Sequence, residues 1–376
     1  QPTKTNFTLS GKLTDGKTGE SLPFAGISFR KANKLVGAQT NVDGLFTLLN
    51  VPSDTCTLFI SYVGYQSKNY YLKPGMSVTD LTITLEPESL SLEEVTISAN
   101  KTEVLKANEV VGMIKMTPKN IAKLPNVGER DPFRAFQLMP GVSASNESSS
   151  GLYVRGGTPD QTLVLYDGFT VYHVDHLFGF FSAFNYNAIK DIQLYKGGFD
   201  AKFGGRISAV AEITGKEGNK KAVNAGADIS MLSANAYFEA PLSKNTTFLF
   251  AGRRSWKGPL YKKIFNRFSE EDTQTSGGFP GGGGGRSFGN FAQNQTANSY
   301  FYDLNSKLTF RPNKKDVFSL SFYNGTDDMD NSTSSSFGGG GGPFGGSSGG
   351  GGLGGLNSST SDVSRWGNLG SSFKWS

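Results

Sequence analysis

Two histidines, His173 and His176, are the residues best suited to metal chemistry, and they form an H-x-x-H pair with Asp175 between them. A zinc site needs three or four protein ligands, and the chain contains no further histidine. Asp167 and Asp175 are the carboxylates that would have to complete the site. Cys56 is the only cysteine, which excludes a cysteine-based metal site and a disulfide within the chain. We expect ordinary loop packing for both histidines, with no metal and no cofactor; a metal site is the alternative.

Other catalytic patterns are weaker still, so an enzyme is the least supported class. The run "GGGGGR" lacks the Lys-Ser/Thr of a phosphate-binding P-loop and follows no predicted strand. No nucleophile–base pair or carboxylate pair stands in a suitable context. The net charge of +5 is mild, and lysine and arginine form separated pairs rather than a basic stripe. Nucleic-acid binding therefore has little support.

A different kind of chemistry, backbone pairing with a partner, is suggested by the stretch "SLSLEEVTISANKTEV" at residues 89–104. Leu92, Val95 and Ile97 stand among Ser, Thr and Glu, which is the pattern of one short strand with no neighbouring strand to join. A lone extended segment suits strand addition, in which backbone hydrogen bonds to another protein supply the affinity. An ordinary interdomain linker is the alternative.

The elements around this segment divide the 376 residues into more than one unit, as expected for a chain longer than a typical single domain. Residues 1–88 contain short alternating segments separated by turn residues, which predicts a small antiparallel β-sandwich. The segments "GKLTDGKTGESLPFAGISF" and "GAQTNVDGLFTLLNVPSDTCTLFISYVGY" resemble the carboxypeptidase regulatory-like domain. That resemblance implies a module without catalytic activity, despite its name.

Residues 105–218 have a mixed character. The segments "TPKNIAKLP" and "RDPFRAFQLMPGV" predict short helices broken by prolines. Four strands follow, in "GLYVRGG", "TLVLYDG", "KDIQLYKGG" and "ISAVAEITGK", and pairs of glycines punctuate them. An α+β unit with tight turns is expected. The aromatic run "FGFFSAF" at 178–184 is expected to pack against a surrounding wall, with a ligand-facing patch as the alternative.

Residues 219–376 show strict alternation. In "YFYDLNSKLTFR" apolar and aromatic residues such as Tyr302 and Leu304 alternate with polar ones such as Asp303 and Asn305 over about 11 residues, the length of a tilted transmembrane strand. No run of about 18 apolar residues predicts a membrane-spanning helix. Strands are expected near 222–231, 233–242, 246–256, 299–311, 316–325 and 364–376.

The links between these strands also fit a transmembrane β-barrel, which has short turns on one side and long loops on the other. The short links "SKN" and "PNKK" fall on one side, and the long links 257–298 and 326–363 fall on the other. Their glycine-rich tracts predict flexible excursions. Six strands cannot close into a barrel that holds a folded domain inside it, which needs about 22 strands. We expect either the N-terminal portion of a larger barrel or missing strands from another chain.

The middle unit resembles the plug domain of TonB-dependent outer-membrane receptors. The resemblance rests on "GLYVRGGTPDQTLVLYDGFTVY" followed by "LFGFFSAFNYNAIKDIQLYKGGFDAKFGGRISAVAEITGK". By the same resemblance, the segment 89–104 contains the TonB box that binds the partner. The box residues are Glu94, Val95, Thr96, Ile97, Ser98 and Ala99. The plug-motif residues are Arg155, Gly156, Gly157, Asp167, Gly168, Gly197, Gly198, Gly204, Gly205 and Arg206.

The resemblance implies a mainly β receptor in the bacterial outer membrane: a sandwich at 1–88, the box and linker at 89–104, a plug at 105–218, and the first strands of an incomplete barrel at 219–376. It implies energised uptake of a ligand, with a TonB-like energy transducer in the periplasm and outer-membrane lipid as partners. The N-terminal extension resembles those of Bacteroidota receptors, where a surface lipoprotein forms a lid. The alternative is a structural or scaffolding subunit of an outer-membrane assembly that does not transport.

Overall fold

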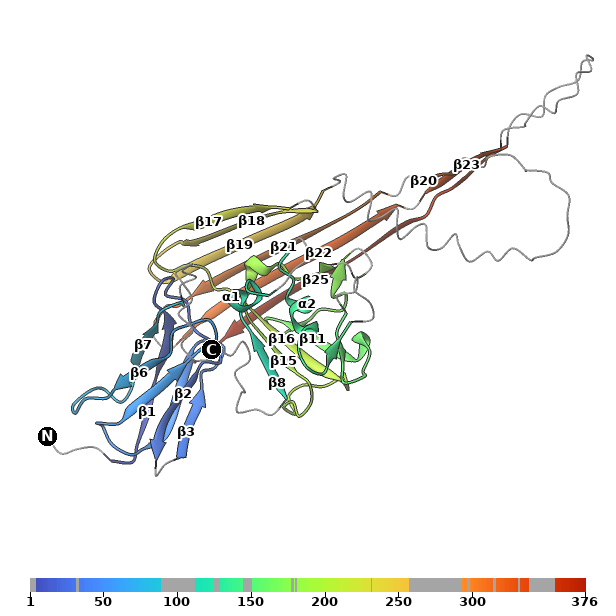
Figure 1. Cartoon of the computed structure of the whole chain (residues 1–376). Helices are drawn as coiled ribbons and strands as arrows, with labels where there is room; N and C mark the ends of the chain where they lie inside the picture. Colours follow the sequence, from blue (N-terminus) through green and yellow to red (C-terminus); the bar gives the residue numbers. More distant parts are fainter. Residues whose placement is uncertain are drawn as a thin grey trace, which may run out of the picture.

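Figure 1 shows three parts of the chain: a blue N-terminal sandwich, a green central unit, and a large sheet coloured yellow to red that lies along one side of it. The computed structural model describes residues 5–31, 34–88, 112–124, 129–144, 151–176, 179, 181–230, 232–256, 293–295, 298–313, 316–330, 332–337 and 356–376. The three parts correspond to the predicted fold class, which is thereby confirmed. The predicted residue limits of the domains stay predictions.

The N-terminal sandwich has two sheets, one with strand order β4-β1-β7 and one with order β3-β2-β5-β6. Alternate side chains of both sheets meet in one apolar core, in which Leu13 and Phe29 are fully buried. The strands are β1 Phe7–Asp15, β2 Gly26–Lys31, β3 Lys34–Gln39, β4 Leu45–Val51, β5 Thr57–Ser61, β6 Lys68–Tyr71 and β7 Leu81–Leu85.

The central unit, called the plug below, is built on a five-stranded sheet with order β12-β11-β16-β15-β8. Its helix α2 begins where predicted: Pro132 occupies the first turn, and the Asp131 carboxylate accepts hydrogen bonds from the amides of Phe133 and Arg134. The elements are β8 Met113–Met116, α1 Pro118–Ile121, α2 Pro132–Gln137, β9 Val142–Ser143, β10 Tyr153–Val154, η1 Pro159–Gln161, β11 Thr162–Tyr166, β12 Phe169–Thr170, β13 Asp175–His176, β14 Phe181–Ser182, η2 Tyr186–Ala188, β15 Ile189–Tyr195 and β16 Ala209–Gly215.

The large sheet, called the wall sheet below, is antiparallel throughout and has the order β17-β18-β19-β21-β22-β25. Its polar side chains, such as Asp303 and Asn305, are buried toward the plug, while Leu304, Leu320 and Phe373 are exposed on the other face. The strands are β17 Asn224–Ile229, β18 Ser233–Pro241, β19 Thr246–Ser255, β21 Asn298–Phe310, β22 Phe318–Asp330 and β25 Val363–Trp375. All six predicted strands are present, and the sheet does not close on itself within the described residues.

One expected loop begins later than predicted. Strand β22 continues to Asp330, so residues 326–330 belong to the sheet rather than to a flexible link. A further small sheet, of order β20-β23-β24, extends beyond the end of the wall sheet (Figure 1). Its strands are β20 Gln293–Gln295, β23 Thr333–Phe337 and β24 Leu356–Thr360. The predicted excursion is therefore partly wrong: its two flanks pair with each other, Thr333 opposite Thr360.

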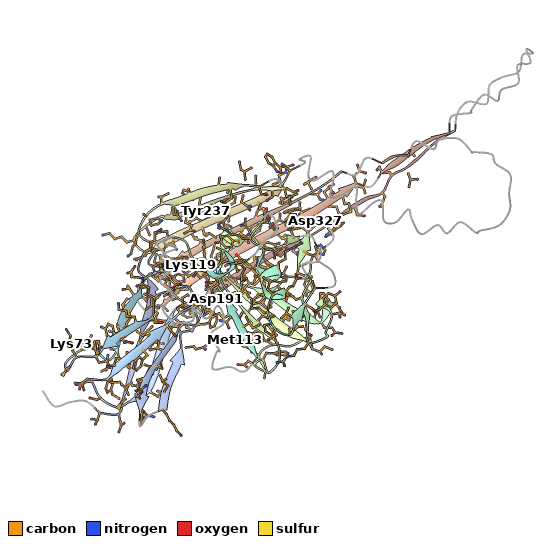
Figure 2. All side chains as sticks on the ribbon, viewed as in Figure 1. Lys73, Met113, Lys119, Asp191, Tyr237 and Asp327 are labelled. Atoms are coloured by element: carbon orange, nitrogen blue, oxygen red, sulfur yellow. The ribbon has the colours of Figure 1, made fainter. Side chains whose placement is uncertain are left out.

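The sandwich contacts the plug and the short-turn end of the wall sheet. Lys374 at the end of β25 forms an ion pair with Asp43 of the sandwich, with Nζ and Oδ2 3.0 Å apart. Figure 2 labels Lys119 and Asp191 where the sandwich meets the plug. None of the helices in the described part of the chain has the length and apolar character of a membrane-spanning helix.

Candidate functional site between the plug and the wall sheet

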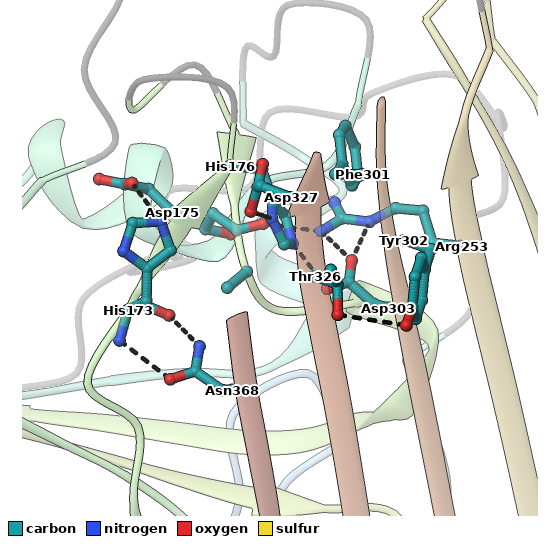
Figure 3. A network of polar contacts seen from close by, with 12 residues as sticks. His173, Asp175, His176, Arg253, Phe301, Tyr302, Asp303, Thr326, Asp327 and Asn368 are labelled. Carbon is teal, nitrogen blue, oxygen red and sulfur yellow. Dashed lines mark hydrogen bonds and ion pairs between the residues drawn. The ribbon is translucent and has the colours of Figure 1, made fainter. Parts of the chain in front are cut away.

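The plug is held against the wall sheet by buried charges, and His176 lies at the centre of one cluster (Figure 3). Its Nδ1 is 2.6 Å from Oδ2 of Asp327 on β22, and its Nε2 is 2.6 Å from Oδ1 of Asp303 on β21. Ionised carboxylates only accept hydrogen bonds, so both ring nitrogens must donate, and the ring is an imidazolium. The ring also stacks on Phe301, with centroids 4.4 Å apart.

The pKa of His176 agrees with this geometry. Burial disfavours the charged ring, but the carboxylates of Asp303 and Asp327 outweigh it and raise the pKa of His176 to about 9. The neighbouring Asp175 belongs to the same strand but points toward His173, 3.6 Å from its Nε2. Burial raises the pKa of Asp175, against the attraction of the histidines.

Arg253 of β19 joins the same cluster from the wall sheet. Its Nε donates to Oδ2 of Asp303 at 2.6 Å, and its two other nitrogens donate to Oε2 of Glu129 at 2.9 Å and to the carbonyl of Ser182 at 2.7 Å. Glu129 precedes α2 and Ser182 lies in β14, so one guanidinium connects the wall to two plug elements. Such bidentate and branched contacts favour arginine over lysine because its donors form a rigid planar fork.

A second cluster forms around Asp167, one of the predicted plug-motif residues. Lys307 of β21 places its Nζ 2.9 and 3.0 Å from the two carboxylate oxygens, and Ser321 of β22 donates to Oδ2 at 2.7 Å. The amide of Gly215 donates to Oδ1 at 3.0 Å. Asp167 thus binds two wall strands and the end of β16 at once.

Local backbone geometry places Asp167 at this position. Asp167 and Gly168 have φ of 45° and 92° and join β11 to β12, where Tyr166 pairs with Phe169. Two central residues with positive φ are typical of a type I′ hairpin turn, for which Asp-Gly is a preferred sequence. The "YDGF" sequence therefore aims the carboxylate out of the plug sheet toward the wall.

The remaining motif residues fall into two groups. Arg155 and Gly156 form a second tight turn, with φ of 49° and 84°, and Gly157 pairs with Val154. A Cβ on Gly197 would lie 3.0 Å from the Arg155 guanidinium, so these two predicted residues are brought together. The other group is exposed, and within it Nη1 of Arg206 donates to the Gly205 carbonyl at 2.9 Å. Its members are Gly198, Gly204, Gly205 and Arg206. The roles of all these residues stay predictions.

The predicted box, the aromatic run and the two histidines were the other candidate sites in the sequence. The predicted box, 94–99, lies outside the described residues. Phe181 packs on Phe301 of the wall with centroids 5.5 Å apart, as expected, while Phe184 turns into the plug core. Within the described residues there is no group of three or more side chains suited to a metal ion. Instead of ordinary loop packing, His176 makes two ion pairs with the wall.

Sequence reasoning missed Glu129, Arg253, Asp303 and Asp327 as partners in the cluster. The position of Asp303 in its predicted strand could have indicated a role, because it stands on the polar face, where a charge has to contact the plug or water. The partner of each charge depends on how the plug is seated, which one strand pattern does not contain.

Comparison with known families agrees with this architecture. Residues 9–97 match the CarboxypepD_reg-like domain, and residues 114–210 match the TonB-dependent Receptor Plug Domain. The chain therefore carries the plug domain of TonB-dependent receptors, preceded by a carboxypeptidase regulatory-like domain. This plug domain places the protein in the bacterial outer membrane. The N-terminal match runs to Ile97 and so overlaps the predicted box.

Solved structures with similar folds are receptors and transporters at low identity. They include the siderophore receptor PirA from Pseudomonas aeruginosa, at 16% identity, covering 61% of this chain and 39% of that chain with a TM-score of 0.37. The siderophore receptor PirA from Acinetobacter baumannii is 15% identical, with 60% of this chain and 37% of that chain covered and a TM-score of 0.40. The outer membrane transporter YddB from Escherichia coli is 12% identical, with 60% of this chain and 36% of that chain covered and a TM-score of 0.37. This receptor chain thus spans less than two fifths of these structures. No curated protein matches the sequence.

Proposed function

We propose that this receptor imports a ligand across the outer membrane with energy supplied by a periplasmic TonB-like transducer, which pairs with the box at Glu94–Ala99. One observation carries the proposal. Strand β8 is the first described plug element after the box, and it lies at the edge of the plug sheet, paired only with β15. Four residue pairs, from Met113–Tyr195 to Met116–Ile192, join the two strands.

As an edge strand, β8 can leave the sheet under tension without breaking the pairing of any other two strands. Thirteen residues, 100–112, separate the box from β8, so a pull on the box is delivered to this strand first. The rest of the plug remains held by the His176 and Asp167 clusters. Loss of β8 would open a path along the plug without releasing it from the wall.

Lipid is the proposed partner of the outer face of the wall sheet. Leu320, Phe373 and Trp375 expose 51%, 70% and 69% of their surface there, which fits contact with acyl chains. A surface lipoprotein lid stays a prediction.

The test replaces both Val95 and Ile97 by proline, because proline removes the amide donors that strand addition uses. Binding of the purified periplasmic domain of the host's transducer should be lost, and so should receptor-dependent growth across a panel of nutrients. A matched control carries Ser91→Pro and Thr102→Pro, in the same tether but outside the box, and should behave as wild type. Growth that survives the box substitutions would favour the scaffolding role over transport.

A further inference from the structure

The N-terminal sandwich contacts β8 itself, the strand that would bear the tension in the proposed function. Lys115 of β8 is buried, and its Nζ donates to the carbonyls of Pro23 at 3.1 Å and Phe24 at 2.7 Å in the sandwich. It also lies 3.0 Å from Oδ2 of Asp191 on β15. An ammonium has three donors, and all three are used.

Two features of the sandwich are arranged around this lysine. Phe24 has φ of 53°, a conformation that is unfavourable for a residue with a bulky side chain, and its carbonyl makes the shortest of the three contacts. Tyr62 donates to Oδ2 of Asp191 at 3.1 Å, and the Lys115 ammonium lies 4.3 Å from its ring centroid. The sandwich therefore surrounds the end of a plug side chain.

The same sandwich is anchored to parts of the receptor that stay with the wall. Glu20 accepts from the amides of Glu217 and Gly218 at 2.9 and 3.1 Å and binds Lys190 of β15 at 3.0 Å. Glu217 in turn pairs with Arg311, just beyond β21, at 2.6 Å. Together with the Lys374–Asp43 pair, these contacts fix the sandwich to the wall sheet.

We propose that the N-terminal sandwich is a clasp: anchored to the wall, it holds β8 through Lys115 and sets the tension at which β8 leaves β15. The inference rests on the proposed function only for the source of the pull. The box joins the sandwich, which ends near Glu88, to β8, so tension on the box loads both ends of the tether. The clasp has to undock before or together with β8, and until then it inhibits opening.

The test measures rupture directly and needs no ligand. A peptide-tag handle is inserted after Lys101, the receptor is reconstituted in a bilayer, and the first rupture is timed under constant force. Lys115→Met keeps the aliphatic stem but removes the three contacts, and it should speed this rupture roughly 100-fold or more, as expected for breaking a buried ion pair. The matched control is Lys119→Met, whose Nζ has no hydrogen-bond partner in the described structure and lies 4.3 Å from the Tyr65 ring centroid. It should rupture like wild type.

A second variant makes the opposite prediction and compares the oxidised and reduced forms of the same protein, so the strain of a side chain at Gly19, whose φ is 73°, is present in both. A Cβ on Gly19 would lie 3.4 Å from the Cβ of Lys220, close to the spacing of about 3.5–4.5 Å in natural disulfides. The pair Gly19→Cys and Lys220→Cys, with Cys56→Ser, should form a disulfide that fixes the sandwich to the segment beside the wall. Oxidation should slow the first rupture at least 10-fold, and reduction should restore it.

Equal rupture times for wild type and Lys115→Met, or a disulfide without effect, would overturn the clasp. Neither result touches the proposed function, because the box prolines test transducer binding separately. Conversely, both rupture tests could give the expected results while growth is unaffected by the proline substitutions in the box. That outcome would support the clasp and refute the transport proposal.

Discussion

The ring of His176 makes a pH-dependent contribution to plug stability whose sign follows from the geometry. The pKa is about 9 in the folded receptor, against 6.5 for an ordinary histidine. Because the folded pKa is the higher one, this stability is fully present below about pH 6.5 and is lost as pH rises through about 9. The two pKa values differ by about 2.5, and a difference of one corresponds to about 1.36 kcal/mol, so protonation of His176 contributes about 3 kcal/mol to stability.

Substitution by glutamine should remove this dependence. In the deprotonated wild type, one ring nitrogen becomes an acceptor facing a carboxylate oxygen at 2.6 Å, which is the source of the lost stability. His176→Gln has no titrating group at this position, so its opening free energy should be lower than wild type near pH 6 and should not change with pH on this account. His173→Gln is the matched control, since its side chain does not lie between two buried carboxylates.

Hydrogen exchange of the Ser182 and Ala183 amides reports on this region, because they donate to Asp131 at 2.7 Å and Val174 at 2.9 Å beside the cluster. The exchange rates, corrected for their intrinsic pH dependence, should show wild type and His173→Gln losing about 3 kcal/mol between pH 6.5 and 9.5. A wild type whose corrected opening free energy is level across this range would refute the imidazolium assignment.

Three other perturbations test the wall and the plug turns. Arg253→Met leaves Asp303 and Glu129 without their shared partner and should cost about 3–5 kcal/mol in chemical denaturation of the plug, whereas Arg254→Met, whose side chain faces outward, should cost under 1 kcal/mol. Gly168→Ala forces a side chain onto φ of 92° and should destabilise the plug by about 1 kcal/mol or more; an unchanged denaturation midpoint would argue against the type I′ turn. Leu320→Lys on the outer face should lower the folding free energy in lipid vesicles by about 2–4 kcal/mol, and a neutral effect would place that face outside the bilayer core.

The wall strands and the plug turns were predictable from sequence because each is governed by local rules. Alternation over Tyr300–Phe310 fixes which side chains face the plug, and Asp-Gly at 167–168 fixes a hairpin turn. The length of β22 was missed because Thr326–Asp330 contains a single apolar residue, Met329, so the alternation of apolar and polar residues stops there. Those residues pair with β25 beyond the apolar band, where the sequence carries no membrane signal.

The contacts that join the parts were not predictable. The H-x-x-H pair at 173–176 suggests a metal site because two histidines so close in sequence could bind the same ion. In the fold they have different partners: His173 contacts β25, and His176 lies between β21 and β22. Lys115 gave no signal either, since a lysine in "GMIKMTP" is normally exposed. Its partners in the sandwich are the backbone carbonyls of residues 23 and 24, and every residue has such a carbonyl, so the sequence does not reveal them.

The proposed transport requires a plug that is firmly seated and can still be moved, and the polar character of the plug–wall contact suits both requirements. An apolar interface gains free energy in proportion to its buried area, and all of that gain must be returned when the surfaces separate. Buried ion pairs behave differently, because the cost of removing the charges from water nearly offsets their attraction. Pairs such as Arg253–Asp303 and Lys307–Asp167 therefore fix one position of the plug while adding little to the cost of rehydrating both sides. The plug keeps its own apolar core for internal cohesion, in residues such as Phe133, Ile192 and Leu194. In the proposed mechanism the tension acts first on β8, so the resistance that matters is that of the contacts of β8 itself: its four residue pairs with β15 and the hydrogen bonds of Lys115 to the sandwich.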